Sequence, residues 1–61
     1  MKEKMEKLIE NLQASLADLD KVEEHAYGYK SAAVRARKAM HQARNELQEL
    51  RKEVQTKKNL G

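Results

Sequence analysis

From Ala33 to Val54, apolar residues recur at alternating steps of three and four residues. The series consists of Ala33, Ala36, Met40, Ala43, Leu47, Leu50 and Val54. A strict 3,4 alternation is the heptad pattern of helices that pack with a left-handed supercoil. The pattern therefore predicts one long helix whose apolar seam packs against other helices, closely where alanines dominate the seam and less closely where leucines do.

A second apolar series covers the first 26 residues. Its members are three or four residues apart, which predicts an amphipathic helix over residues 2–26; they are Met5, Leu8, Leu12, Leu16, Leu19, Val22 and Ala26. The chain has no proline and two glycines, of which only Gly28 is internal. We expect Gly28 to take the left-handed position after the first helix, and Ser31 to cap a second helix over residues 31–58.

The short connection over residues 27–30 favours antiparallel packing of the two helices. The sequence thus predicts an all-α fold, a two-helix antiparallel hairpin, as a single domain over residues 1–61. Ordering a chain costs about 1.5 kcal/mol per residue, and one hairpin without cysteine buries little to offset it. We therefore expect a homo-oligomer, with a dimer favoured, built as a coiled coil or four-helix bundle. The alternative is one continuous helix of about 90 Å, with Gly28 inside it at a cost of about 1 kcal/mol.

Charge is distributed unevenly along the chain, which carries +3 overall. Residues 1–24 hold seven acids and four bases, residues 25–44 hold five bases and no acid, and residues 45–61 hold four bases and three acids. A polyanion is expected to bind the middle segment, where the positive charge is concentrated.

Five bases recur at intervals of seven residues in the second helix. This basic row consists of Lys30, Arg37, Arg44, Arg51 and Lys58, and it would extend about 42 Å along one side of a helix. Arg35 and Lys38 add charge near the start of that helix, where the helix dipole favours acids by about 0.3–1 kcal/mol each. Arginines beside free backbone N–H groups suit phosphate. An ordinary solvated face is the other interpretation of the same charges.

Two segments resemble a known family. GYKSAAVRARK, residues 28–38, and LQELRKEV, residues 47–54, resemble the bacterial linker-histone-like proteins of the chlamydial nucleoid histone type, in a short, tail-less form. The resemblance covers essentially the whole chain and implies a nucleoid-associated, DNA-binding protein. Its matching bases are Lys30, Arg35, Arg37, Lys38, Arg51 and Lys52. With Arg44 from the basic row, the predicted DNA-binding set is Lys30, Arg35, Arg37, Lys38, Arg44, Arg51 and Lys52.

Asn and Gln, which read base edges, are scarce near the start of the second helix, so we expect contact with the DNA backbone and little sequence preference. DNA bridging or compaction would follow from two copies of the basic row in a dimer. The alternative is a structural or adaptor coiled coil that self-associates without nucleic acid. Binding to an anionic membrane surface is a third hypothesis, although the chain has no Trp or Phe to anchor an apolar face.

Catalysis is not expected, because the chain has no cysteine nucleophile and shows no Ser–His–acid constellation or glycine-rich phosphate loop. We predict no catalytic residues, cofactor or small-molecule substrate, and no metal site, since His25 and His41 are far apart in sequence. Tyr27 and Tyr29 are expected either to cover the hairpin end of the core or to stack on a base or sugar. With no secretory segment and no run of about 18 apolar residues, we expect a cytoplasmic, nucleoid-associated protein.

Overall fold

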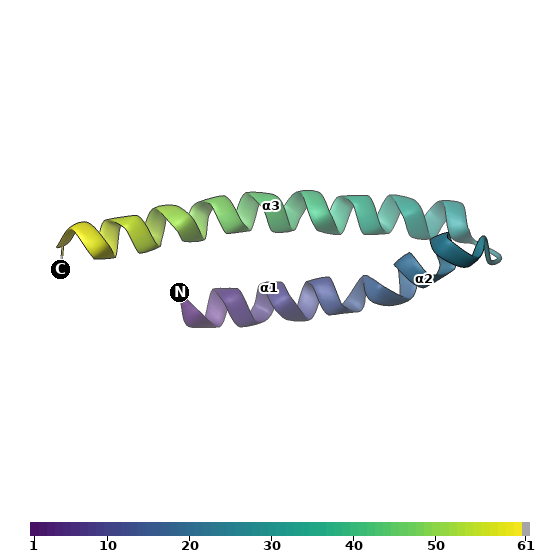
Figure 1. Ribbon diagram of the computed structural model, residues 1–61, viewed down its shortest axis with the longest axis horizontal. Helices are drawn as coiled ribbons and strands as arrows, with labels where there is room; N and C mark the ends of the chain where they lie inside the picture. The colour runs from purple at the N-terminus through teal and green to yellow at the C-terminus, as the bar shows by residue number, and fades with distance from the viewer. Residues whose placement is uncertain (61) are drawn as a thin grey trace.

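The computed structural model describes residues 1–60 and consists of three α-helices. They are α1 (Lys2–Ala14), α2 (Leu16–Glu24) and α3 (Tyr29–Leu60). Residues 1–60 contain no strand, and the all-α prediction is confirmed. α1 and α2 run back along α3, and the C-terminal end of α3 extends beyond the N-terminus (Figure 1).

Two ion pairs set the register between the two halves of the chain. Near the N-terminus, Lys4 Nζ contacts Glu53 Oε1. Near the turn, Arg35 Nη2 donates to Asp18 Oδ1 at 2.9 Å. Both pairs join α3 to the preceding helices, so the chain reverses direction and the alternative of one continuous helix is wrong.

The first helical segment is divided at Ser15. We predicted one helix over residues 2–26, whereas the structure has α1 and α2, with α2 ending at Glu24. The Ser15 hydroxyl donates to the Asn11 carbonyl at 3.4 Å, and the Ser15 N–H donates to Leu12 O at 3.0 Å. A serine hydroxyl that bonds the carbonyl four residues earlier tends to bend a helix. Ser15 is also buried, so its hydroxyl needs this partner.

The turn begins earlier than the sequence suggested. His25, with φ 52° and ψ 36°, takes the left-handed position after α2. The N–H of Ala26 bonds Lys21 O and that of His25 bonds Val22 O, which is the Schellman pattern of helix ends. Gly28 also has positive φ, at 82°, but it lies just before α3. The prediction that Ser31 caps the second helix is wrong, because α3 already begins at Tyr29.

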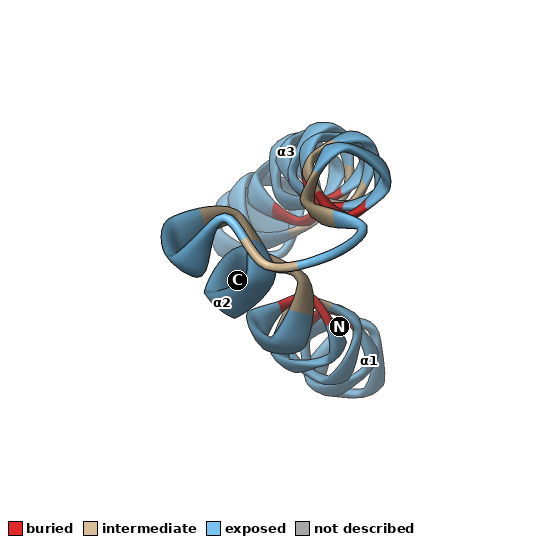
Figure 2. Ribbon diagram, turned by 90° about the vertical axis from the view of Figure 1, so that its right-hand side faces the viewer, coloured by how far each residue is buried: buried red, intermediate tan, exposed pale blue. Residues whose placement is uncertain are grey.

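The core lies between α3 and the two shorter helices. Leu8, Ala43 and Leu50 form its central cluster, with Leu12 packed against them. Towards the turn, Ala32 and Ala36 are almost completely buried, and these alanines let α2 approach α3 closely. Figure 2 shows the buried residues on the inner sides of α1 and α3.

The predicted seam of α3 is only half correct. Ala36, Ala43 and Leu50 are buried, but Met40, Leu47 and Val54 remain 47%, 39% and 56% exposed. Residues four apart on a helix are rotated by about 40°. The 3,4 series therefore contains two adjacent rows of residues, and only one of them faces α1 and α2.

Candidate nucleic-acid interface

The predicted DNA-binding side chains all lie on α3 and all are exposed. Because α3 is unbroken over 32 residues, residues seven apart stay on one side of it, spaced by about 10.5 Å. Lys30, Arg37, Arg44 and Arg51 are held in this way. Regular spacing along a straight helix is what an extended polyanion requires, because each charge meets a different part of the ligand.

Arg35 differs from the other bases of the set, because it is paired. Its Nη2 lies 2.9 Å from Asp18 Oδ1, and its Nε lies 3.3 and 3.4 Å from the two carboxylate oxygens. The hydrogen bond from Arg35 holds the pKa of Asp18 below its usual value, and the same bond raises the pKa of Arg35. Within residues 1–60, no other member of the predicted set forms an ion pair.

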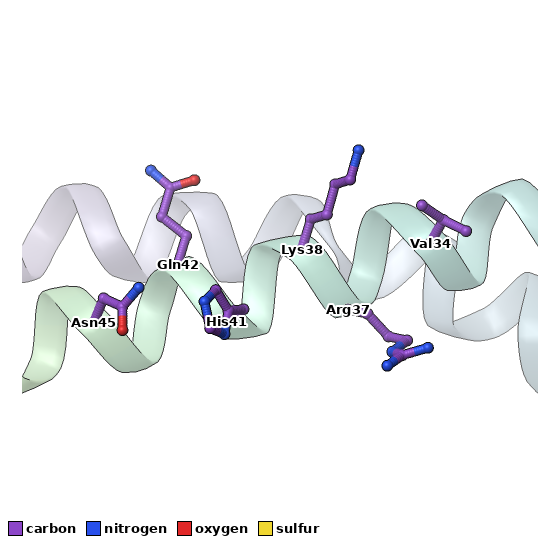
Figure 3. A pocket seen from close by; sticks show the side chains of 6 residues that line it. All are labelled: Val34, Arg37, Lys38, His41, Gln42 and Asn45. Carbon is purple, nitrogen blue, oxygen red and sulfur yellow. The ribbon is translucent and has the colours of Figure 1, made fainter.

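The outer surface of α3, away from α1, carries a shallow hollow. It is lined by Val34, Arg37, Lys38, His41, Gln42 and Asn45. In Figure 3, Arg37 and Lys38 point to opposite sides of α3, and His41 follows them along the helix. The hollow is lined by two cations and contains no carboxylate, so a phosphate there would meet no negative charge.

Further along α3, the cations lie beside apolar and amide side chains. Arg44 and Arg51 border a groove lined by Leu12, Met40 and Leu47. Arg51 and Lys52 share a second hollow with Gln48 and Gln55. Arg44, Arg51 and Lys52 therefore lie together on one flank and the adjoining outer surface of α3.

The carboxylates of α3 lie on the other side of the molecule. Glu46, Glu49 and Glu53 line a hollow together with Lys4 and Lys7 of α1. There the hydrogen bond between Lys4 and Glu53 lowers the pKa of Glu53 and raises that of Lys4. Because α1 supplies cations to these acids, Arg44 and Arg51 keep their charges uncompensated by acids of their own helix.

The N-terminal end of α3 also lacks acids. Its first turn contains no carboxylate, while Lys57 and Lys58 occupy its last turn, where cations are favourable. Tyr29 stacks on His25, with ring centroids 4.3 Å apart. Tyr27 is fully exposed, so the expectation that it covers the hairpin end of the core is wrong.

Among the residues that the structure describes, no three His, Cys, Asp or Glu side chains are grouped as metal ligands would be. No described helix combines the length and apolar character needed to cross a membrane.

A family model described as histone H1-like protein Hc1 matches residues 2–60. The chain belongs to this family. The resemblance inferred from residues 28–38 and 47–54 is therefore confirmed. Members of the Hc1 family are histone H1-like, DNA-binding proteins of the nucleoid and not enzymes, so DNA binding in general follows from membership. No curated protein and no solved structure matches the chain.

For this member of the histone H1-like family, sequence reasoning missed two features beside the basic row. One is the Asp18–Arg35 pair, which needs the register between α2 and α3. The other is the apolar row of Met40, Leu47 and Val54 next to the arginines. The sequence shows the seven-residue interval of these three residues, but the 3,4 pattern assigns them to the same seam as the buried residues.

Proposed function

We propose that this chain binds the sugar-phosphate backbone of DNA without sequence preference, through the basic side of α3. The observation that carries the proposal is the set of Arg37, Arg44 and Arg51. They are exposed, seven residues apart, and without an ion-pair partner within residues 1–60. Membership of a histone-like family supports the same ligand.

Phosphate suits these side chains better than base edges do. Arginine presents a fork of N–H donors that matches phosphate oxygens, and it stays charged at any physiological pH. Spacing of about 10.5 Å along a straight helix allows successive arginines to meet separate phosphates. Neutralising phosphates releases counterions from DNA, and this release drives binding that is independent of sequence.

The contributions of the seven bases are expected to differ. The complete proposed contact set is Lys30, Arg35, Arg37, Lys38, Arg44, Arg51 and Lys52. Arg35 is held by Asp18, so a phosphate has to compete with a carboxylate for it. Lys38 and Lys52 lie on the outer surface and add charge on the flank of the basic row.

The test is fluorescence anisotropy with a labelled duplex of arbitrary sequence at several salt concentrations. One variant changes Arg37, Arg44 and Arg51 to Gln, and the control changes Lys2, Lys7 and Lys21 to Gln. Both variants reduce the net charge from +3 to zero. Wild-type affinity should fall steeply with salt, at about −0.9 in log K per log salt for each phosphate neutralised.

In the arginine variant, we expect most of the affinity to be lost. The slope of log K against log salt should fall by an amount that corresponds to about three phosphate contacts. The lysine control should retain the greater part of both. Equal losses in the two variants would show that net charge, and not the row on α3, governs binding. An unchanged affinity across duplexes of different sequence is the expected result for backbone contact.

We further propose that the functional unit is a homodimer of helical hairpins, packed as a coiled coil or four-helix bundle and located in the nucleoid. A dimer presents two basic surfaces, so it would bridge or compact DNA. Single-molecule images of DNA with the protein should show loops. Bound DNA that keeps its contour and forms no loops would refute bridging while leaving binding intact.

A structural coiled coil that works without nucleic acid is the second candidate function. Met40, Leu47 and Val54 favour it, because an exposed apolar row is suited to a protein partner. Self-association together with no DNA binding at low salt would select this candidate over the first.

A further inference from the structure

One face of the molecule is left apolar after α1 and α2 have packed on α3. Leu12, Met40, Ala43 and Leu47 line a single groove there. On α1 Met5 and Leu12 are seven residues apart, and on α3 Met40, Leu47 and Val54 have the same interval. We call it the open apolar face: Leu12, Met40 and Leu47 of the groove, together with the exposed Met5 of α1, Leu19 of α2 and Val54 of α3.

Apart from Leu12, which packs against the core cluster, the residues of this face are too exposed to belong to a finished core. Met5 is 40% exposed, Leu19 37% and Val54 56%. Beside Met5 and Leu12 the apolar surface continues over Ile9 and Leu16. An apolar surface that follows two helices along their shared length is typical of a face that another helical pair covers.

The borders of the face carry opposite charges. Along α3 the border is basic, because Arg44 lies four residues after Met40 and Arg51 four residues after Leu47, where side chains are neighbours on a helix. Along α1 and α2 the border carries two acids and one base, a net negative charge. Glu6 lies three residues before Ile9, Asp20 lies four residues after Leu16, and Lys2 lies three residues before Met5.

We propose that a second copy of this chain covers the open apolar face, with α3 of each copy packed over α1 and α2 of the other. A two-fold axis parallel to the helices produces this arrangement. It places the apolar rows of the two copies together and each basic border against the acidic border of the partner. The opposite arrangement, with α3 on α3, would bring two basic borders together, which like-charge repulsion disfavours.

This inference specifies the homodimer named under Proposed function, but it does not require DNA binding. Arg44 and Arg51 lie at the border and not in the apolar centre, so phosphate can still reach them. Exposed ion pairs contribute only about 0.2–1 kcal/mol, and a phosphate can displace a border carboxylate. A failure of DNA binding would therefore leave the dimer proposal intact.

The first experiment measures the mass of the chain by sedimentation equilibrium without DNA. Wild type should show twice the chain mass of 7.1 kDa. Leu47→Glu, which places a carboxylate in the open apolar face, should shift the protein to the monomer. Asn45→Glu makes the same charge change on the outer surface of α3 and should leave the dimer in place. Circular dichroism of both variants reports whether they remain helical.

The second experiment tests the orientation, and it needs no variant in the apolar face. The chain has no cysteine, so Glu6→Cys and Arg51→Cys each introduce one thiol. Residues 6 and 51 lie at similar heights along the molecule, because Lys4 contacts Glu53. When the two variants are mixed and oxidised, disulfides between residue 6 and residue 51 of different chains should predominate.

Two results would overturn the proposal. At several hundred micromolar, even a weak dimer with an association free energy of about −4 to −5 kcal/mol begins to form. If the wild-type protein still has the mass of one chain at this concentration, no second copy covers the face. A predominance of disulfides between two copies of residue 51 would show that the α3 helices pack on one another, contrary to the charge argument.

Discussion

Leu8→Ala is the substitution that most directly tests how this small fold is held together. Leu8 is 3% exposed and packs with Ala43 and Leu50. Two of the five buried apolar residues are leucines, and the others are alanines. Leu8 is therefore the main apolar contribution of α1 to the core, and its truncation leaves α1 with little to bury.

The magnitude follows from the burial of Leu8. Replacing a buried leucine by alanine costs about 2–5 kcal/mol. A chain of this length is expected to have a free energy of unfolding of about 3–9 kcal/mol. The substitution should thus remove a large fraction of the total stability. For a small domain, each kcal/mol lost from the free energy of unfolding lowers the melting temperature by about 4–8 °C. The melting temperature should therefore fall by at least about 8 °C.

The assay is thermal unfolding followed by circular dichroism at 222 nm, at one protein concentration for all variants because self-association raises apparent stability. The matched control is Leu60→Ala, the same chemical change at a residue that is 80% exposed. This control should change the free energy of unfolding by less than about 0.5 kcal/mol. Equal melting temperatures for Leu8→Ala and Leu60→Ala would refute the assignment of Leu8 to the core.

Three further predictions concern the turn and the ion pair beside it. Gly28→Ala should destabilise the fold by about 1–2 kcal/mol in thermal melts, because φ is 82° and nothing near Gly28 offers new contacts; unchanged melting would mean that the turn relaxes freely. Asp18→Asn should lower stability at pH 7 yet raise DNA affinity in anisotropy, because it releases Arg35. Arg35 lowers the pKa of Asp18, so the stability from this pair is present at neutral pH and is lost as pH falls through that lowered pKa. The difference in melting temperature between wild type and Asp18→Asn should therefore narrow in acid. Tyr27→Ala should change the free energy of unfolding by no more than an ordinary surface substitution does, about 0.5 kcal/mol, because Tyr27 is fully exposed; a large drop in melting temperature would contradict its exposure.

The helices were predictable because their signals are local. The 3,4 alternation from Ala33 to Val54 identified α3, and the single internal glycine identified the region of the turn. The exact turn was not predictable. The left-handed residue is His25, and residues other than glycine take this conformation in only a few per cent of cases. The hydrogen bonds of Ala26 and His25 to α2 reveal it.

The packing of the two halves depends on register, which no local pattern specifies. A 3,4 series includes the row of Ala36, Ala43 and Leu50 and the row of Met40, Leu47 and Val54, and either row can face α1 and α2. Ser15 illustrates the same limit, because a serine in an apolar series reads as exposed until the neighbour that covers it is known. The basic row itself was predictable, since it requires only that α3 is continuous.

Met40 and Leu47 belong to one row, and Arg44 and Arg51 to the next row on the same helix. Both rows repeat every seven residues. Supercoiling that keeps the apolar row against a partner helix therefore also keeps the arginine row at a constant angle to that partner. A second copy seated on the open apolar face would therefore set the direction in which all the arginines of α3 point, over the full length of contact. In this way the period of the apolar residues, and not a rigid pocket, would give the phosphate-binding side chains a common orientation along DNA.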